Sequence, residues 1–171
     1  MDEHVIASSF QSGPRRVQVV LPDAYDATQR YPVLYVLPVE PEGQCVYGDG
    51  LSVLRELDVA NRYSVILVQP GFSHTPWYID HATDPAVRPA CHLEQVVVPF
   101  IEQRYATLAG RAGRLLIGFS KSGWGAFSLI LQHPAFWGYA ASWDAPLLMA
   151  DYHWNVAADF GCNPDRPPNV V

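Results

Sequence analysis

Ser120 lies at the junction between a short apolar run and a glycine-rich helical segment, in the stretch 114–125 with the sequence RLLIGFSKSGWG. Small residues flank it, with Gly118 before it and Ser122 and Gly123 after it. A turn from strand to helix at such a point is so sharp that its central residue takes a strained backbone, and only small neighbours avoid a collision. The helix N-terminus stabilises developing negative charge. This pattern predicts a nucleophile elbow with Ser120 as the attacking group.

Ser122 stands where the strict G-x-S-x-G pattern has its second glycine. An alternative interpretation is a serine N-cap followed by a glycine-rich turn, because serine is a preferred N-cap residue. The apolar run before Ser120 and the helical segment after it form the context that an elbow requires. This context favours the elbow over the simple cap.

The elements that would position Ser120 follow from the apolar pattern. Short apolar runs bounded by Pro, Gly or Asp predict strands over 17–21, 33–37, 65–68, 115–117 and 139–143. Helical spacing of apolar residues predicts helices over 51–62, 92–105 and 122–133, with a kink at Pro99. This alternation predicts an α/β fold, with a mostly parallel sheet and helices on both faces.

The composition narrows the function class. The chain has 171 residues, of which 49% are hydrophobic and 16% charged, and we expect one domain over 1–171. A net charge of −6 with scattered basic residues argues against nucleic acid and favours a small-molecule partner. No apolar run is long enough to cross a membrane, and acidic residues follow Met1, so we expect a cytoplasmic protein. The three cysteines match neither a disulfide framework nor a zinc motif.

Two stretches resemble one family. Residues 100–146, FIEQRYATLAGRAGRLLIGFSKSGWGAFSLILQHPAFWGYAASWDAP, and residues 22–38, PDAYDATQRYPVLYVLP, are similar to the group of α/β-hydrolases that contains esterase D and the feruloyl, siderophore and S-formylglutathione esterases. The resemblance covers about residues 15–148 and implies an α/β-hydrolase fold and a serine esterase. Pro38 and Val39 replace the His-Gly pair of that group, and Lys121 replaces the usual Met or Gln after the nucleophile.

The same fold implies where the oxyanion is bound. Its oxyanion hole combines two backbone N–H groups. One belongs to the residue after the nucleophile, here Lys121, and the other lies in the loop after the third strand of the fold, which is the strand predicted here at 33–37. We assign the second donor to Glu40, because Pro41 has no N–H. Lys121 is the single lysine of the chain, and we hypothesise that its side chain pairs with Glu40 near the pocket. The alternative is a solvated charge that the elbow tolerates.

The general base is harder to place. In this fold the triad runs in the order Ser, Asp or Glu, His, yet only His133 and His153 follow Ser120. His133 closes the elbow helix at roughly 20 Å from the serine, and His153 follows the predicted strand 139–143 too closely. Asp144 is a candidate acid, although a helix cap is the commoner role for such a residue. We expect the chain to lack the C-terminal strands that would carry the acid and the histidine.

The loop after the strand at 65–68 faces the ligand crevice in such folds. We assign His74, Trp77 and Tyr78 from this loop to the substrate pocket, with core packing as the alternative for the two aromatic residues. Nearby potential metal ligands have spacings that match no ligand pattern; they are His74, His81, Asp80, Asp84, Cys91 and His92. We therefore expect no metal and no cofactor.

Two classes of function remain open. The first is a serine esterase that cleaves a small-molecule carboxylic ester through an acyl-enzyme on Ser120, with acyl transfer to an alcohol as a variant. The second is a non-catalytic α/β-hydrolase-fold binding protein, or an inactive fragment without the triad histidine. An incomplete sheet would also leave a bare strand edge, which predicts self-association.

Overall fold

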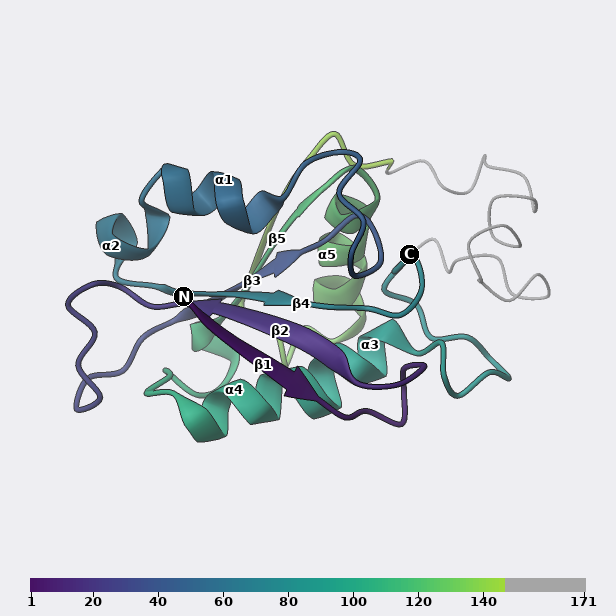
Figure 1. The fold of residues 1–171 in the computed structure, drawn as a ribbon, viewed down its shortest axis with the longest axis horizontal. Helices are drawn as coiled ribbons and strands as arrows, with labels where there is room; N and C mark the ends of the chain where they lie inside the picture. The colour runs from purple at the N-terminus through teal and green to yellow at the C-terminus, as the bar shows by residue number, and fades with distance from the viewer. Residues whose placement is uncertain (147–171) are drawn as a thin grey trace.

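One six-stranded sheet forms the centre of the computed structural model, which describes residues 1–146 (Figure 1). The strand order is β1-β2-β4-β3-β5-β6. The strands are β1 (Asp2–Ile6), β2 (Arg15–Val20), β3 (Val33–Leu37), β4 (Ile66–Pro70), β5 (Arg114–Phe119) and β6 (Tyr139–Trp143). The pairs β1–β2 and β2–β4 are antiparallel, whereas β3–β4, β3–β5 and β5–β6 are parallel. The predicted mostly parallel α/β sheet is confirmed.

Helices cover both faces of the sheet, as predicted. One face packs on α1 (Gly50–Glu56) and α2 (Val59–Tyr63), where side chains such as Val36 and Leu51 form one core. The opposite face packs on α3 (Pro89–His92), the π-helical turn η1 (Leu93–Val97), α4 (Val98–Arg104) and α5 (Ser120–Gln132). The short 3₁₀ turn η2 (Arg111–Gly113) leads into β5. Figure 1 shows the two groups of helices on opposite sides of the strands.

The helices differ in detail from their predicted forms. The segment 51–62 is divided into α1 and α2 by Asp58, whose φ of 57° lies in the left-handed region. The segment 92–105 runs through the wide turn η1 just before Pro99. Because proline has no N–H, it cannot donate to the carbonyl one turn earlier, and a π-helical turn accommodates this loss. The irregularity therefore lies on the N-terminal side of the proline.

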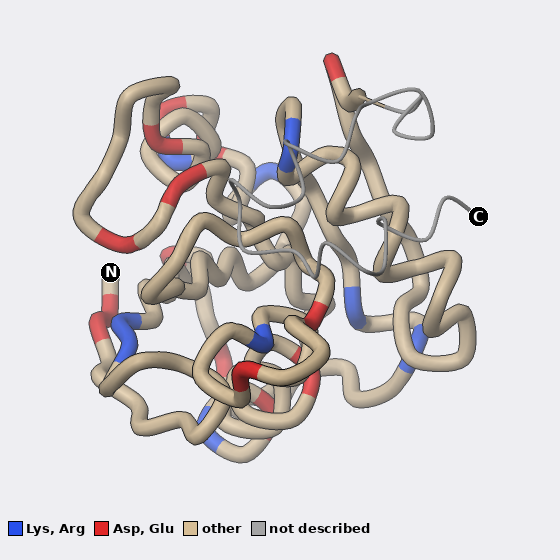
Figure 2. Tube along the Cα trace, turned by 90° about the vertical axis from the view of Figure 1, so that its right-hand side faces the viewer, with Lys and Arg blue, Asp and Glu red and all other residues tan. Residues whose placement is uncertain are grey.

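Charged residues are dispersed over the molecule. Figure 2 shows Lys and Arg positions interspersed with Asp and Glu along the trace. Several basic residues are used in ion pairs, including the bidentate pair of Arg114 with Glu102 at 2.7 and 3.0 Å.

Within residues 1–146, no helix has the length and apolar character that a membrane crossing requires.

Candidate active site

Ser120 occupies a sharp bend between β5 and α5. Its φ is 51°, in the left-handed region that a non-glycine residue rarely adopts. Gly118, near the end of β5, has no room for a side chain, because an added Cβ would overlap the backbone of Ser122 and Gly123. The chain therefore turns back on itself within a few residues, which is the geometry predicted for a nucleophile elbow. Ser120 also begins the 13-residue helix α5, two residues earlier than predicted.

Ser122 explains the departure from the usual elbow pattern. Its side chain is fully buried, and its Oγ accepts a hydrogen bond from the Phe119 N–H at 3.0 Å and donates one to the Phe119 carbonyl at 2.9 Å. These bonds close the bend from inside and satisfy an N–H at the helix N-terminus. Where other elbows have glycine, this chain uses a small hydroxyl side chain that braces the turn.

Replacing Ser122 with alanine is therefore expected to lower the free energy of unfolding by about 1–2 kcal/mol, because the partly buried Phe119 N–H loses its acceptor. Urea unfolding followed by circular dichroism measures this change. The matched variant is Ser128→Ala on the same helix, where the hydroxyl, among the described residues, accepts from the Gln132 side chain alone and the loss should be smaller. Equal losses in the two variants would contradict the bracing role.

The loop after β3 starts beside the elbow. In the parallel pair β3–β5, the last partners are Leu37 and Gly118, so the two chains leave the sheet side by side. Glu40 and Lys121 each lie three residues beyond this pair. Lys121 is the second residue of α5, so its N–H is among the first N–H groups at the N-terminus of this helix. The topology thus brings both predicted oxyanion donors to the same edge of the sheet.

The loop is anchored away from the elbow as well. The Glu42 carboxylate accepts from the Arg16 N–H at 3.0 Å and forms ion pairs with the Arg15 and Arg16 side chains at 3.6 and 3.4 Å. The Glu42 N–H donates to the Phe72 carbonyl at 2.9 Å. Glu42 therefore ties the loop to the ends of β2 and β4.

The predicted ion pair between Glu40 and Lys121 is wrong. No salt bridge joins them among the residues that the structure describes. Glu40 instead accepts from the Val46 N–H at 2.7 Å, within its own loop. The Lys121 ammonium lies 5.5 Å from the centre of the Trp77 ring, in a cation–π contact. The local backbone donor satisfies Glu40, so the two charges have separate partners.

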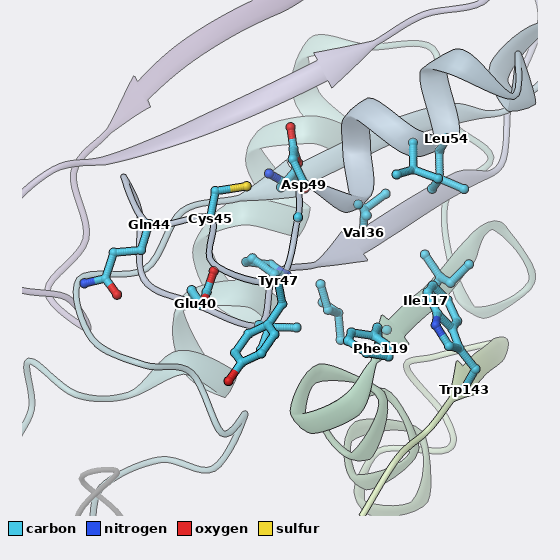
Figure 3. Close-up of a pocket in the computed structure, with 18 of the residues that line it drawn as sticks. Val36, Glu40, Gln44, Cys45, Tyr47, Asp49, Leu54, Ile117, Phe119 and Trp143 are labelled. Carbon is cyan, nitrogen blue, oxygen red and sulfur yellow. The ribbon is translucent and has the colours of Figure 1, made fainter.

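A cavity of about 490 Å³ opens next to the elbow (Figure 3). The loop after β3, the start of α1 and the ends of β3 and β5 enclose it. Its mainly apolar walls include Val36, Leu54, Ile117, Phe119 and Trp143, and the loop residue Glu40 also lines it. Figure 3 shows the Phe119 and Trp143 side chains facing the cavity from the side of β5 and β6. Its lining reaches Phe119, the residue before Ser120, and does not include Ser120.

The three residues predicted for the pocket do not line this cavity. His74 is exposed, and its Nδ1 is hydrogen-bonded to the Ser73 hydroxyl at 2.9 Å. Trp77 is buried and packs edge-to-face on Trp124 at 5.9 Å between ring centres. Tyr78 is also buried and belongs to the main core. Core packing, the alternative stated above, describes Trp77 and Tyr78.

The described residues contain five histidines, and none of them is hydrogen-bonded to the Ser120 hydroxyl. His133 follows the far end of α5, where its Nδ1 contacts the Glu94 carboxylate at 2.6 Å. His92 is fully buried in α3, and His153 lies outside the described residues. Asp144 follows β6 with a φ of 53° and is exposed.

The potential metal ligands are not brought together within the described part of the chain. No group of three or more His, Cys, Asp or Glu residues is arranged to hold a metal ion there. Burial, together with the nearby Asp80 carboxylate, raises the pKa of Cys91 to about 11. This thiol is therefore protonated at neutral pH, whereas metal binding uses the thiolate.

Two experimental structures share this fold. A ferulic acid esterase from the anaerobic fungus Anaeromyces mucronatus is 23% identical, with a TM-score of 0.65 over 84% of this chain and 58% of that chain. An S-formylglutathione hydrolase from Agrobacterium tumefaciens is 15% identical, with a TM-score of 0.77 over 97% of this chain and 65% of that chain. Together with the observed sheet, these similarities establish the α/β-hydrolase fold.

Sequence comparison gives the family. Esterase Rv1288 of Mycobacterium tuberculosis H37Rv is 30% identical over 147 residues, which are 81% of this chain and 32% of that protein. The chain thus spans about a third of the length of this relative. A family model described as "Putative esterase" matches residues 8–158, which is most of the chain. The chain therefore belongs to this esterase family.

Proposed function

We propose that this protein is a serine esterase in which the Ser120 hydroxyl attacks the carbonyl carbon of a small-molecule carboxylic ester. The observation that carries the proposal is the left-handed φ of 51° at Ser120, where β5 meets the N-terminus of α5. Strained backbone of this kind concentrates at functional sites, and the elbow presents a nucleophile at the carboxyl edge of the sheet. Membership of the esterase family supports the same reaction.

In this mechanism, attack by Ser120 Oγ forms a tetrahedral intermediate and transfers the hydroxyl proton to a general base. The backbone N–H groups of Lys121 and Glu40 bind the resulting oxyanion, and the N-terminus of α5 stabilises its charge. Collapse releases the alcohol, which takes up the proton, and leaves an acyl-enzyme that water hydrolyses. Because no histidine is hydrogen-bonded to Ser120 within residues 1–146, we place the base outside this range.

A binding protein that uses the same crevice without turnover is the second candidate. It is favoured by the absence of a histidine partner for Ser120 within the described range. The two candidates differ in the reactivity of one hydroxyl. A nucleophilic Ser120 reacts covalently with an electrophilic phosphorus centre, whereas an ordinary serine does not.

Incubation with a fluorophosphonate probe, followed by peptide mass spectrometry, tests the proposal. We expect the label on the peptide that contains Ser120 and complete loss of labelling in Ser120→Ala. The matched control is Ser64→Ala, because Ser64 has a similar φ of 49° but lies at the C-terminal end of a helix. Its labelling should equal that of the wild type. Labelling that persists in Ser120→Ala, or a wild type that stays unlabelled, would exclude the esterase mechanism and favour the binding protein.

A further inference from the structure

Tyr78 combines strain with complete burial. Its φ is 58°, and only 1% of its surface is exposed. For a bulky aromatic residue this backbone conformation is a true outlier, which persists only where the surroundings fix it. The residue lies in the loop after β4, outside the regular elements. The strained backbone is therefore explained if it brings the Tyr78 side chain to a particular partner.

Two partners of Tyr78 lie on the two sides of the candidate site. The Tyr78 hydroxyl donates a hydrogen bond of 2.7 Å to the carbonyl of Pro38, at the start of the loop after β3. The Tyr78 ring packs against Gly125 of α5 so closely that a Cβ at Gly125 would overlap it. A third contact, edge-to-face with Phe72 at 5.5 Å, holds the ring from the β4 side. One side chain thus connects the elbow helix with the loop that carries Glu40.

The hydrogen bond acts directly on the backbone of that loop. It fixes the orientation of the peptide between Pro38 and Val39, which is the peptide unit immediately before the Glu40 N–H. Glu42 and its arginine partners anchor the loop further along, so Glu40 lies between two fixed points. An oxyanion donor is effective only when it is held in place before the reaction, because preorganised dipoles need no rearrangement in the transition state.

We propose that Tyr78 is a positioning residue that sets the place of the Glu40 N–H relative to the Lys121 N–H. This inference rests on the proposed function, in which these two groups bind the oxyanion. Tyr78 itself touches neither the ester nor Ser120 in this scheme; it acts through the loop and through α5.

Tyr78 remains a hydrogen-bond donor at neutral pH. Burial raises the pKa of its hydroxyl well above the ordinary value of a tyrosine. The bond to Pro38 therefore does not depend on titration of Tyr78, and substitution of this residue should change rates without adding a new ionisation to the pH profile.

The test compares Tyr78→Phe with Tyr35→Phe. Both variants remove only a hydroxyl from a buried tyrosine, but the Tyr35 hydroxyl has no hydrogen-bond partner among the described residues. Fluorophosphonate labelling of Ser120 should be about tenfold to a hundredfold slower in Tyr78→Phe, since small displacements of catalytic groups have effects of this size. Labelling in Tyr35→Phe should stay within about twofold of the wild type. With a turned-over ester, kcat should fall while KM stays constant.

Hydrogen exchange of the backbone amides separates this inference from the proposed function. In Tyr78→Phe the Val46 amide, which donates to the Glu40 carboxylate at 2.7 Å, should exchange faster than in the wild type and in Tyr35→Phe, while amides in the middle of β3 keep their protection. Unchanged exchange at Val46, or equal labelling rates in the two variants, would overturn the positioning role and leave the esterase proposal standing. If the wild type is not labelled at all, the esterase proposal fails and the catalytic part of this inference fails with it.

Discussion

Gly118→Ala is expected to lower the free energy of unfolding by about 3 kcal/mol, the upper part of the usual range for overpacking. The added methyl group would overlap the backbone of Ser122 and Gly123. Backbone atoms cannot rotate away as the end of a side chain can, so the bend itself would have to open. Opening the bend moves Ser120, and fluorophosphonate labelling should fall together with stability.

Urea unfolding of Gly118→Ala beside Gly50→Ala measures this effect. Gly50, in helix α1, is the matched position, because its added Cβ would meet one side-chain atom, Val36 Cγ1 at 3.1 Å, and no backbone atom. Alanine gains up to about 1 kcal/mol over glycine in a helix, so Gly50→Ala should be nearly neutral. A Gly118→Ala variant as stable as the wild type would show that the elbow is not sterically confined.

Acidification is expected to destabilise the protein through His92. This side chain is fully buried, and burial lowers its pKa to about 4, with a further lowering by the positive charge of Arg15. The Gly71 backbone opposes part of this shift, although neither ring nitrogen has a hydrogen bond of good geometry to a described residue. The His92 ring packs edge-to-face on Phe72, with 5.5 Å between the ring centres, and so joins the core beside Tyr78.

The sign follows from proton binding. Between the ordinary histidine pKa of 6.5 and the folded value of about 4, the unfolded chain binds a proton at His92 that the folded chain does not. The contribution of neutral His92 to the free energy of unfolding is therefore complete above pH 6.5, and it is lost as the pH falls to about 4. The loss is roughly 1.4 kcal/mol for each pH unit and about 3 kcal/mol in total.

Unfolding free energies between pH 7.5 and 4.5 provide the measurement. Carboxylates contribute to the wild-type slope as well, so the quantity of interest is the difference from His92→Phe, which removes the titrating group and keeps a ring. His74→Gln is the control, because His74 is exposed and should leave the slope unchanged. If His92→Phe has the wild-type slope, burial of His92 does not cause the acid sensitivity.

The interior of the fold was predictable from the sequence for a simple reason. Strands β3 and β4 are buried on both faces and read as continuous apolar runs, which have few alternative interpretations. The bend at Ser120 was predictable because only small residues fit around it. By contrast, β1 has the sequence DEHVI and a mostly exposed surface, so this edge strand gives no apolar pattern. It forms because β2 pairs with it along its whole length.

The side-chain partners around the site could not be predicted in the same way. Glu40 and Lys121 do come to one edge of the sheet, but a backbone N–H only six residues away satisfies the carboxylate. Trp77 and Tyr78 have the composition of a pocket wall, and only the packing on Trp124 and Gly125 shows that they are interior. Such choices depend on contacts that sequence spacing does not specify.

The in-register pair of Leu37 with Gly118 has a consequence for how this enzyme family can diversify. Neighbouring strands lie about 4.8 Å apart, so the sheet ladder, and not the length of the connecting segment, sets the separation at which the two chains begin. Residues 43–48 are exposed and lie beyond the Glu42 anchor, and several of them wall the cavity. We therefore expect insertions within 43–48 to change the shape of the cavity while the pairing of Leu37 with Gly118 is retained.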